Sequence, residues 1–129
     1  MPAITATILG AVVTGLGKLM DTVRRTGSKR TQRQDQALTL IYAAANETRL
    51  YIEQAEASKK RDRPREQQLV RLWTRAALPV RHIDPHLADR CLLKADLWIN
   101  PSRWTPAQIR EFHIGINEVY EYARQLLQE

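Results

Sequence analysis

The sequence has a single cysteine, few aromatic residues and no long run of apolar residues. With only one thiol, Cys91, the chain cannot form an internal disulfide, which is usual for proteins of a reducing cytosol. Residues 1–17 carry no charged side chain, but a helix of that length, at about 1.5 Å per residue, falls short of a hydrocarbon core about 30 Å thick. No basic residue precedes this stretch, so it lacks the pattern of a secretory signal peptide. We therefore expect a cytoplasmic protein, with association at a membrane surface as the alternative.

Strands are also missing from the pattern, because no stretch alternates strictly between apolar and polar residues. The length of 129 residues, with 43% hydrophobic and 26% charged residues, suits one globular domain covering residues 1–129. Helical spacing of apolar residues predicts five helices, and short connections between amphipathic helices favour antiparallel neighbours. The predicted fold is therefore all-α, an antiparallel up-down bundle of four to five helices.

The predicted helices cover residues 3–25, 33–59, 64–82, 85–99 and a last segment that begins at Pro106. The start of the last helix has the clearest local signal: Thr105 can cap it and Gln108 can complete a capping box, with Trp104 and Ile109 at the positions of a hydrophobic staple. We expect the following side chains to be largely buried: Leu38, Ile41, Leu72, Trp98, Ile109, Phe112, Ile116 and Leu126.

The net charge of +6 is concentrated in the N-terminal quarter of the chain. Residues 1–33 hold six basic residues and one acidic residue, whereas the other 96 residues hold fourteen basic and thirteen acidic ones. Such asymmetry favours an anionic partner near that end, and a second basic cluster covers residues 59–65. The predicted anion- or phosphate-binding residues are Arg24, Arg25, Lys29, Arg30, Arg33, Lys59, Lys60 and Arg61. The helix between the two clusters spans roughly 40 Å, which places them at opposite ends of a bundle.

An apolar N-terminal helix over residues 1–25, followed by a basic linker over residues 26–32, is the least ordinary feature. Glycines at positions 10, 15 and 17 each cost about 1 kcal/mol in an exposed helix, so packing, a partner or a membrane must offset them. The helix can therefore be a bundle helix, a helix docked in another chain, or an interfacial helix with a polybasic anchor. The predicted partner-binding residues are Ile8, Val12, Leu16, Leu19 and Val23. In that interpretation, deleting residues 1–24 leaves a folded remainder.

Metal and cofactor chemistry have little support. His82 and His86 are four residues apart, but Asp84 and Pro85 interrupt a helix between them, so the two imidazoles do not share a face. Cys91 lies on an apolar stripe, where a thiol stays protonated and inert. We assign no metal, no cofactor and no catalytic residue.

One short motif points to RNA cleavage. Arg81 and His86 are separated by four residues, which resembles the Arg–x4–6–His signature of HEPN-type helical ribonucleases. The resemblance implies that a His acts as general acid or base and that an Arg holds the phosphate. The structural alternative is that Arg81 pairs with Asp84 or with a helix C-terminus.

The function that these observations favour is a non-enzymatic helical accessory or interaction module. It would act through its N-terminal helix, either in a homo-oligomer or in a larger protein complex. Three alternatives stay open: a basic bundle that binds nucleic acid, a membrane-associating helical protein, and a HEPN-like ribonuclease.

Overall fold

The computed structural model describes residues 2–128, and the side chains of residues 8–128. Throughout this part of the chain the secondary structure is helical, with no strand. The four long helices are α1 (Pro2–Thr26), α2 (Gln32–Ser58), α3 (Arg63–Val80) and α6 (Pro106–Gln128). The short elements are α4 (Pro85–Arg90), α5 (Ala95–Trp98) and the 3-10 turns η1 (Gly27–Lys29), η2 (Leu92–Lys94) and η3 (Pro101–Arg103). The all-α prediction and the four long helices are confirmed.

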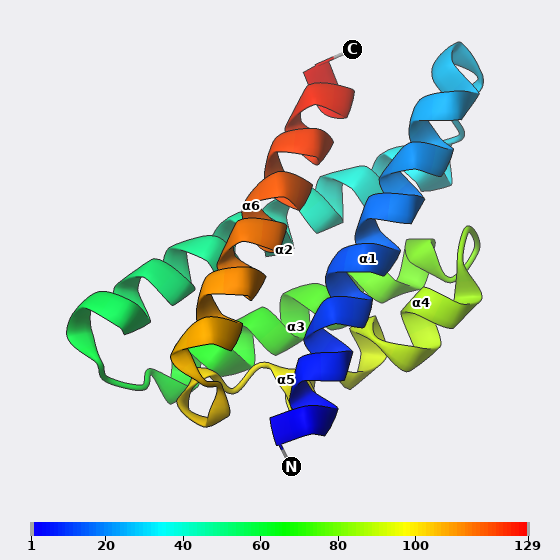
Figure 1. Ribbon diagram of the computed structural model, residues 1–129. Helices are drawn as coiled ribbons and strands as arrows, with labels where there is room; N and C mark the ends of the chain where they lie inside the picture. The colour runs from blue at the N-terminus through cyan, green and yellow to red at the C-terminus, as the bar shows by residue number, and fades with distance from the viewer. Residues whose placement is uncertain (1, 129) are drawn as a thin grey trace.

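The long helices do not follow an up-down order. Helix α2 runs antiparallel to α3 and to α6, whereas α1 lies beside α6 and runs in the same direction (Figure 1). Side-chain contacts show this direction, since Asp21 accepts a hydrogen bond from Tyr122 and Arg30 donates to the carbonyl of Leu126. The predicted antiparallel packing therefore holds for the pairs α2–α3 and α2–α6, and the up-down arrangement is corrected because α1 packs mainly on α6.

Capping side chains fix where the long helices begin. The Thr105 hydroxyl accepts from the Gln108 N–H at 3.1 Å, and the Gln108 side chain accepts from the Thr105 N–H at 2.8 Å, as predicted. Thr31 and Gln34 form a second capping box at the start of α2, which the sequence analysis did not predict. Both boxes satisfy backbone donors that the first helical turn leaves without partners.

The helix predicted over residues 85–99 is wrong, because the chain breaks at Cys91. There α4 ends, and residues up to Trp98 form η2 and then α5. The indole N–H of Trp98 donates to the Cys91 carbonyl at 2.9 Å, and the Lys94 N–H donates to the same oxygen at 3.1 Å. The Cys91 carbonyl therefore accepts hydrogen bonds from a buried side chain and from a 3-10 turn, and the α-helix ends there.

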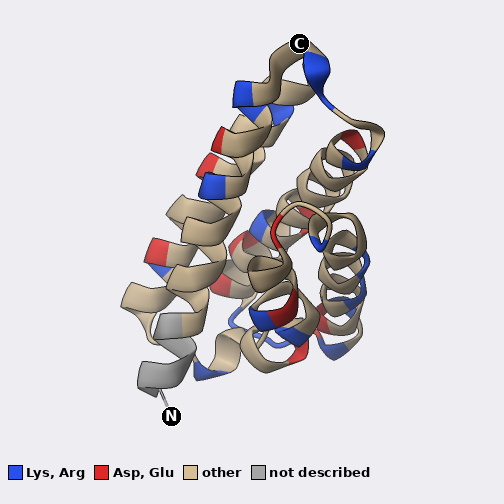
Figure 2. Ribbon diagram, turned by 90° about the vertical axis from the view of Figure 1, so that its right-hand side faces the viewer, with Lys and Arg blue, Asp and Glu red and all other residues tan. Residues whose placement is uncertain are grey.

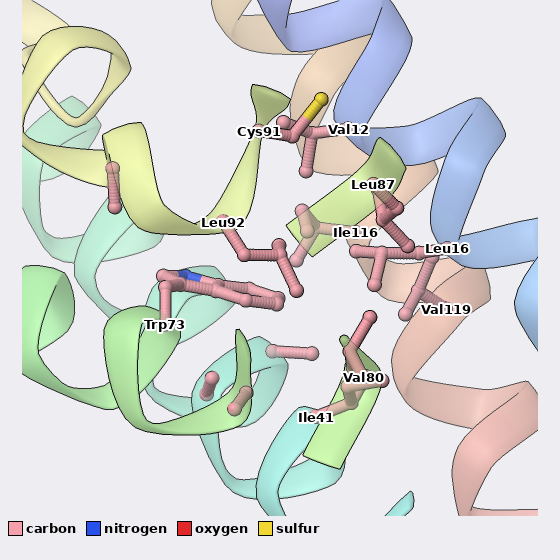
Figure 3. Close-up of a cluster of buried hydrophobic side chains, with 14 of the residues drawn as sticks. Val12, Leu16, Ile41, Trp73, Val80, Leu87, Cys91, Leu92, Ile116 and Val119 are labelled. Carbon is pink, nitrogen blue, oxygen red and sulfur yellow. The ribbon is translucent and has the colours of Figure 1, made fainter. Parts of the chain in front are cut away.

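The core is built from one face of every long helix and from the α4–α5 segment. Val12 and Leu16 of α1 lie among buried side chains of α2, α3, α4 and α6 (Figure 3). Six of the eight side chains predicted as core are buried: Leu38, Ile41, Trp98, Phe112, Ile116 and Leu126. Leu72 and Ile109 are only half-buried. Trp73 takes the inward position next to Leu72, and Ile109 lines a pocket.

Two glycines allow helices to approach closely. A Cβ added at Gly115 of α6 would lie 2.7 Å from a methyl carbon of Val13, and one added at Gly15 of α1 would lie 2.5 Å from Leu87. Close packing therefore accounts for one of the three glycines of α1. Gly10 and Gly17 have open space where a Cβ would be.

We expect opposite effects on stability from alanine at two of these glycines. Gly10→Ala should raise the free energy of unfolding by about 1 kcal/mol, because the site is open and alanine favours the helix. Gly115→Ala should lower it by about 1–3 kcal/mol, because the new methyl group meets the branched side chain of Val13. Urea unfolding of both variants measures this, and a shift of the same sign in both would contradict the α1–α6 packing.

Candidate binding pocket

A pocket of about 490 Å³ opens between the end of α2, the start of α3, η3 and the first turns of α6. This volume lies within the range of about 300–1,000 Å³ that is usual for ligand sites. The apolar part of its lining comes from Ile52, Ala55, Pro101, Pro106, Ile109 and Ile114. The charged and polar part includes Glu56, Lys59, Lys60, Arg61, Arg110 and His113.

The basic side of the pocket is the loop between α2 and α3. Lys59 caps α2 in a left-handed conformation, with φ of 56°, and its N–H donates to the Ala55 carbonyl at 2.8 Å. Asp62 then caps α3 by accepting from the Arg65 N–H at 3.1 Å. The two caps turn the chain within a few residues, so Lys59, Lys60 and Arg61 lie together at the pocket.

A buried polar network anchors this loop. Glu66, only 4% exposed, accepts from the Tyr51 hydroxyl at 2.6 Å and from Arg61 Nε at 2.8 Å. The Tyr51 oxygen also accepts from the Asp62 N–H at 3.1 Å. Burial, reinforced by the hydrogen bond to Glu66, raises the pKa of Tyr51 to about 12. The hydroxyl therefore keeps its proton at neutral pH and holds the loop against α2 and α3.

The mouth of the pocket carries unpaired positive charge beside an exposed apolar side chain. Within residues 8–128, the side chains of Lys59, Lys60 and Arg110 have no ion-pair partner, and one exposed acid of the lining, Glu56, has none either, so these four charges sum to a positive value. Glu66 already compensates Arg61, and Glu53 lies 3.3 Å from His113. Ile114 is 54% exposed at the same place. The arrangement can therefore hold an apolar group and one or two anions at once.

The predicted partner-binding face of α1 needs correction. Val12, Leu16, Leu19 and Val23 are at most 2% exposed, and Ile8 is half-buried. These side chains already pack in the core of their own chain, so another protein could reach them only if α1 left the bundle. Of the three interpretations of this helix, the bundle helix describes the fold.

The N-terminal members of the predicted anion-binding set are largely engaged within the chain. Arg30 pairs with Asp35 at 2.6 Å, Arg33 contacts His82 Nδ1 at 2.8 Å, and Arg24 lies 5.7 Å from the ring centre of Tyr122. Arg25 reaches the Thr22 hydroxyl at 3.4 Å, and Lys29 is exposed. These residues belong to the end of α1, to η1 and the residue after it, and to the start of α2, at the other end of α2 from Lys59, Lys60 and Arg61. Figure 2 shows basic segments of the ribbon at that end.

Of the two residues of the ribonuclease-like motif, Arg81 has an ion-pair partner and His86 is exposed. Arg81 pairs with Asp89 at 2.8 Å, whereas Asp84 caps α4 by accepting from the Leu87 N–H at 3.0 Å. The expected pairing of Arg81 with Asp84 or a helix end is thus replaced by the pair with Asp89.

Burial raises the pKa of the Cys91 thiol, which lies in the core as predicted. Within the described residues, no three His, Cys, Asp or Glu side chains gather as metal ligands.

Part of this pocket was predicted from the sequence. Lys59, Lys60 and Arg61 were predicted as anion-binding residues, whereas Arg110, His113 and Ile114 of α6 were not. A signal was present, because Arg110, His113 and Ile114 lie at helical spacing just outside the buried stripe of α6. The sequence alone could not show that this face of α6 lies beside the basic loop at residues 59–61.

Comparisons with known proteins neither add to nor restrict these assignments. No protein family, curated protein or solved structure matches the chain significantly. In the described part of the chain, every helix is too short or too polar to cross a bilayer.

Proposed function

We propose that the protein is a non-enzymatic interaction module that binds an acidic segment of a partner protein in the pocket between α2, α3 and α6. One observation carries this proposal: an apolar pocket has three cations at its mouth, Lys59, Lys60 and Arg110, without partners in the described chain. The pocket replaces the N-terminal helix as the element through which the module acts.

The chemistry of the lining indicates what the bound segment contains. A large apolar side chain can enter between Ile52, Ala55 and Ile109, where it loses contact with water. Carboxylates next to it in the partner can reach the lysines and Arg110 at the mouth. Because such charges sit at the rim, they mainly speed association and select the partner, while the apolar contact slows dissociation.

Charge placement favours a protein segment over the alternatives. Nucleic acid needs a continuous row of cations along its phosphates, whereas the two basic clusters lie at opposite ends of α2. An apolar lining adds little to phosphate binding. Membrane insertion through α1 would expose Leu16 and its buried neighbours to lipid at the expense of the core. In the ribonuclease interpretation, a phosphate would have to compete with Asp89 for Arg81.

Selection from a random peptide library tests the proposal without a known partner. We expect peptides selected on the wild-type protein to combine one large apolar residue with two or more acidic residues. Two variants should fail to select them: Ile114→Asp, which places a carboxylate at the mouth, and Lys60→Glu with Arg110→Glu, which reverses two rim charges. Binding of a selected peptide should weaken as salt rises, since the rim charges are exposed.

Matched controls separate the pocket from general surface effects. Leu78→Asp changes an apolar side chain of α3 that is 61% exposed, and Arg71→Glu with Arg75→Glu reverses two exposed charges of the same helix. Neither control should alter the selection. Enrichment of neutral or basic peptides, or equal losses in the control variants, would overturn the proposal.

A further inference from the structure

A second polar cluster lies on the surface where α2 and α6 meet, away from the pocket. The rings of Tyr42 and Tyr120 stack with centres 5.1 Å apart and planes 19° apart. Their hydroxyl oxygens are 3.5 Å apart, a long contact that either group can give up at little cost. Two phenol hydroxyls, one from each helix, are therefore held side by side.

Two arginines lie near this tyrosine pair. The guanidinium of Arg49 lies 4.2 Å from the ring centre of Tyr120, and its Nε donates to the Asn46 side chain at 3.0 Å. These contacts fix the plane of the guanidinium, and within residues 8–128 no carboxylate forms an ion pair with it. Arg124 follows Tyr120 by one helical turn and reaches Glu121 only at 3.5 Å, with both side chains about half exposed.

The two arginines supply positive potential to the tyrosine pair. The hydroxyl contact between the rings lowers the pKa of Tyr120 and raises that of Tyr42, whereas Arg49 and Arg124 lower both. Glu121 contacts Arg124 at 3.5 Å, so a bound anion would compete with this exposed carboxylate, whereas Glu53 contacts His113. The same positive potential that stabilises a phenolate would stabilise a bound anion.

We propose that Tyr42, Arg49, Tyr120 and Arg124 form a site for a phosphate dianion, either free phosphate or a phosphate monoester. The two guanidinium groups and the two hydroxyls offer charge-assisted donors from both helices, which suits an oxyanion with several acceptor oxygens. A halide could use only one or two of these donors. The site is distinct from the proposed pocket, because none of its four residues lines that pocket.

Titration with inorganic phosphate, followed by backbone and Arg Nε NMR signals, tests the site. We expect saturable shifts at the four residues, and no comparable shifts with chloride at the same ionic strength. Arg49→Gln and Tyr120→Phe should each weaken binding by about tenfold or more, because each removes a donor to a charged ligand. Arg71→Gln, an exposed arginine of α3, should leave the affinity unchanged.

A second measurement gives a signature that a structural role would not produce. Bound phosphate should raise the pKa of Tyr120, because the dianion opposes a second negative charge, and the phenolate absorbance then appears at higher pH. A phosphoserine peptide that binds at least tenfold more tightly than inorganic phosphate would assign the site to phosphoproteins, and equal affinities would assign it to free phosphate. Three results would overturn the proposal. They are chloride-induced NMR shifts as large as those with phosphate, a loss of affinity in Arg71→Gln as large as in Arg49→Gln, and an oligonucleotide phosphodiester that binds more tightly than inorganic phosphate.

Discussion

Leu16→Asp is expected to unfold the protein. The Leu16 side chain is fully buried in the cluster that α1 shares with α4 and α6 (Figure 3). Losing the leucine side chain costs about 2–5 kcal/mol, and an unpaired carboxylate in its place adds several more. Because domains of this size have about 5–15 kcal/mol of stability in total, the variant should lose most of its cooperative urea transition and much of its circular dichroism signal.

Thr14→Asp is the matched control, because Thr14 lies on the same helix and is exposed. It should change the free energy of unfolding by less than about 0.5 kcal/mol. A Leu16→Asp protein as stable as the wild type would mean that α1 is not core and would restore the exposed partner-binding helix.

Deleting residues 1–24 should have the same outcome as Leu16→Asp, in contrast to the folded remainder expected from the sequence. The deletion removes six buried side chains from the core: Leu9, Val12, Leu16, Leu19, Met20 and Val23. A wide apolar face looks the same in the sequence whether its own chain or another protein covers it. The packing of Val13 on Gly115 and of Leu87 on Gly15 decides between them, and both pairs join distant segments.

Local signals predicted the long helices, and distant contacts decided how they are arranged. The Thr105 capping box acts within a few residues, so the sequence alone showed it. The pocket depends instead on the antiparallel packing of α2 against α6, which brings Ile52 close to Ile109. The basic loop at residues 59–61 was therefore predicted, but its apolar neighbours on α6 were not.

The buried side chain of Trp98 contacts the chain where the predicted helix breaks at Cys91. Its ring packs against Trp73 and Phe112, with centres 5.8 Å and 5.7 Å away, and its indole N–H bonds the Cys91 carbonyl. Helical periodicity over residues 85–99 was real, but it could not reveal that a tryptophan seven residues later would take this carbonyl. Trp98→Ala should therefore cost about 3–5 kcal/mol of stability.

A pair of tryptophan-to-phenylalanine variants separates this hydrogen bond from packing. Trp98 and Trp104 are both buried and both meet Phe112 edge-on, but within the described residues the Trp104 indole N–H has no hydrogen-bond partner. Trp98→Phe removes a donor and leaves the buried Cys91 carbonyl with the Lys94 N–H alone, whereas Trp104→Phe removes a donor that was unsatisfied. We expect Trp98→Phe to lower the free energy of unfolding by about 1–3 kcal/mol more than Trp104→Phe does. Equal losses in chemical denaturation would show that the hydrogen bond to Cys91 contributes nothing and that packing alone shapes the segment between α4 and α5.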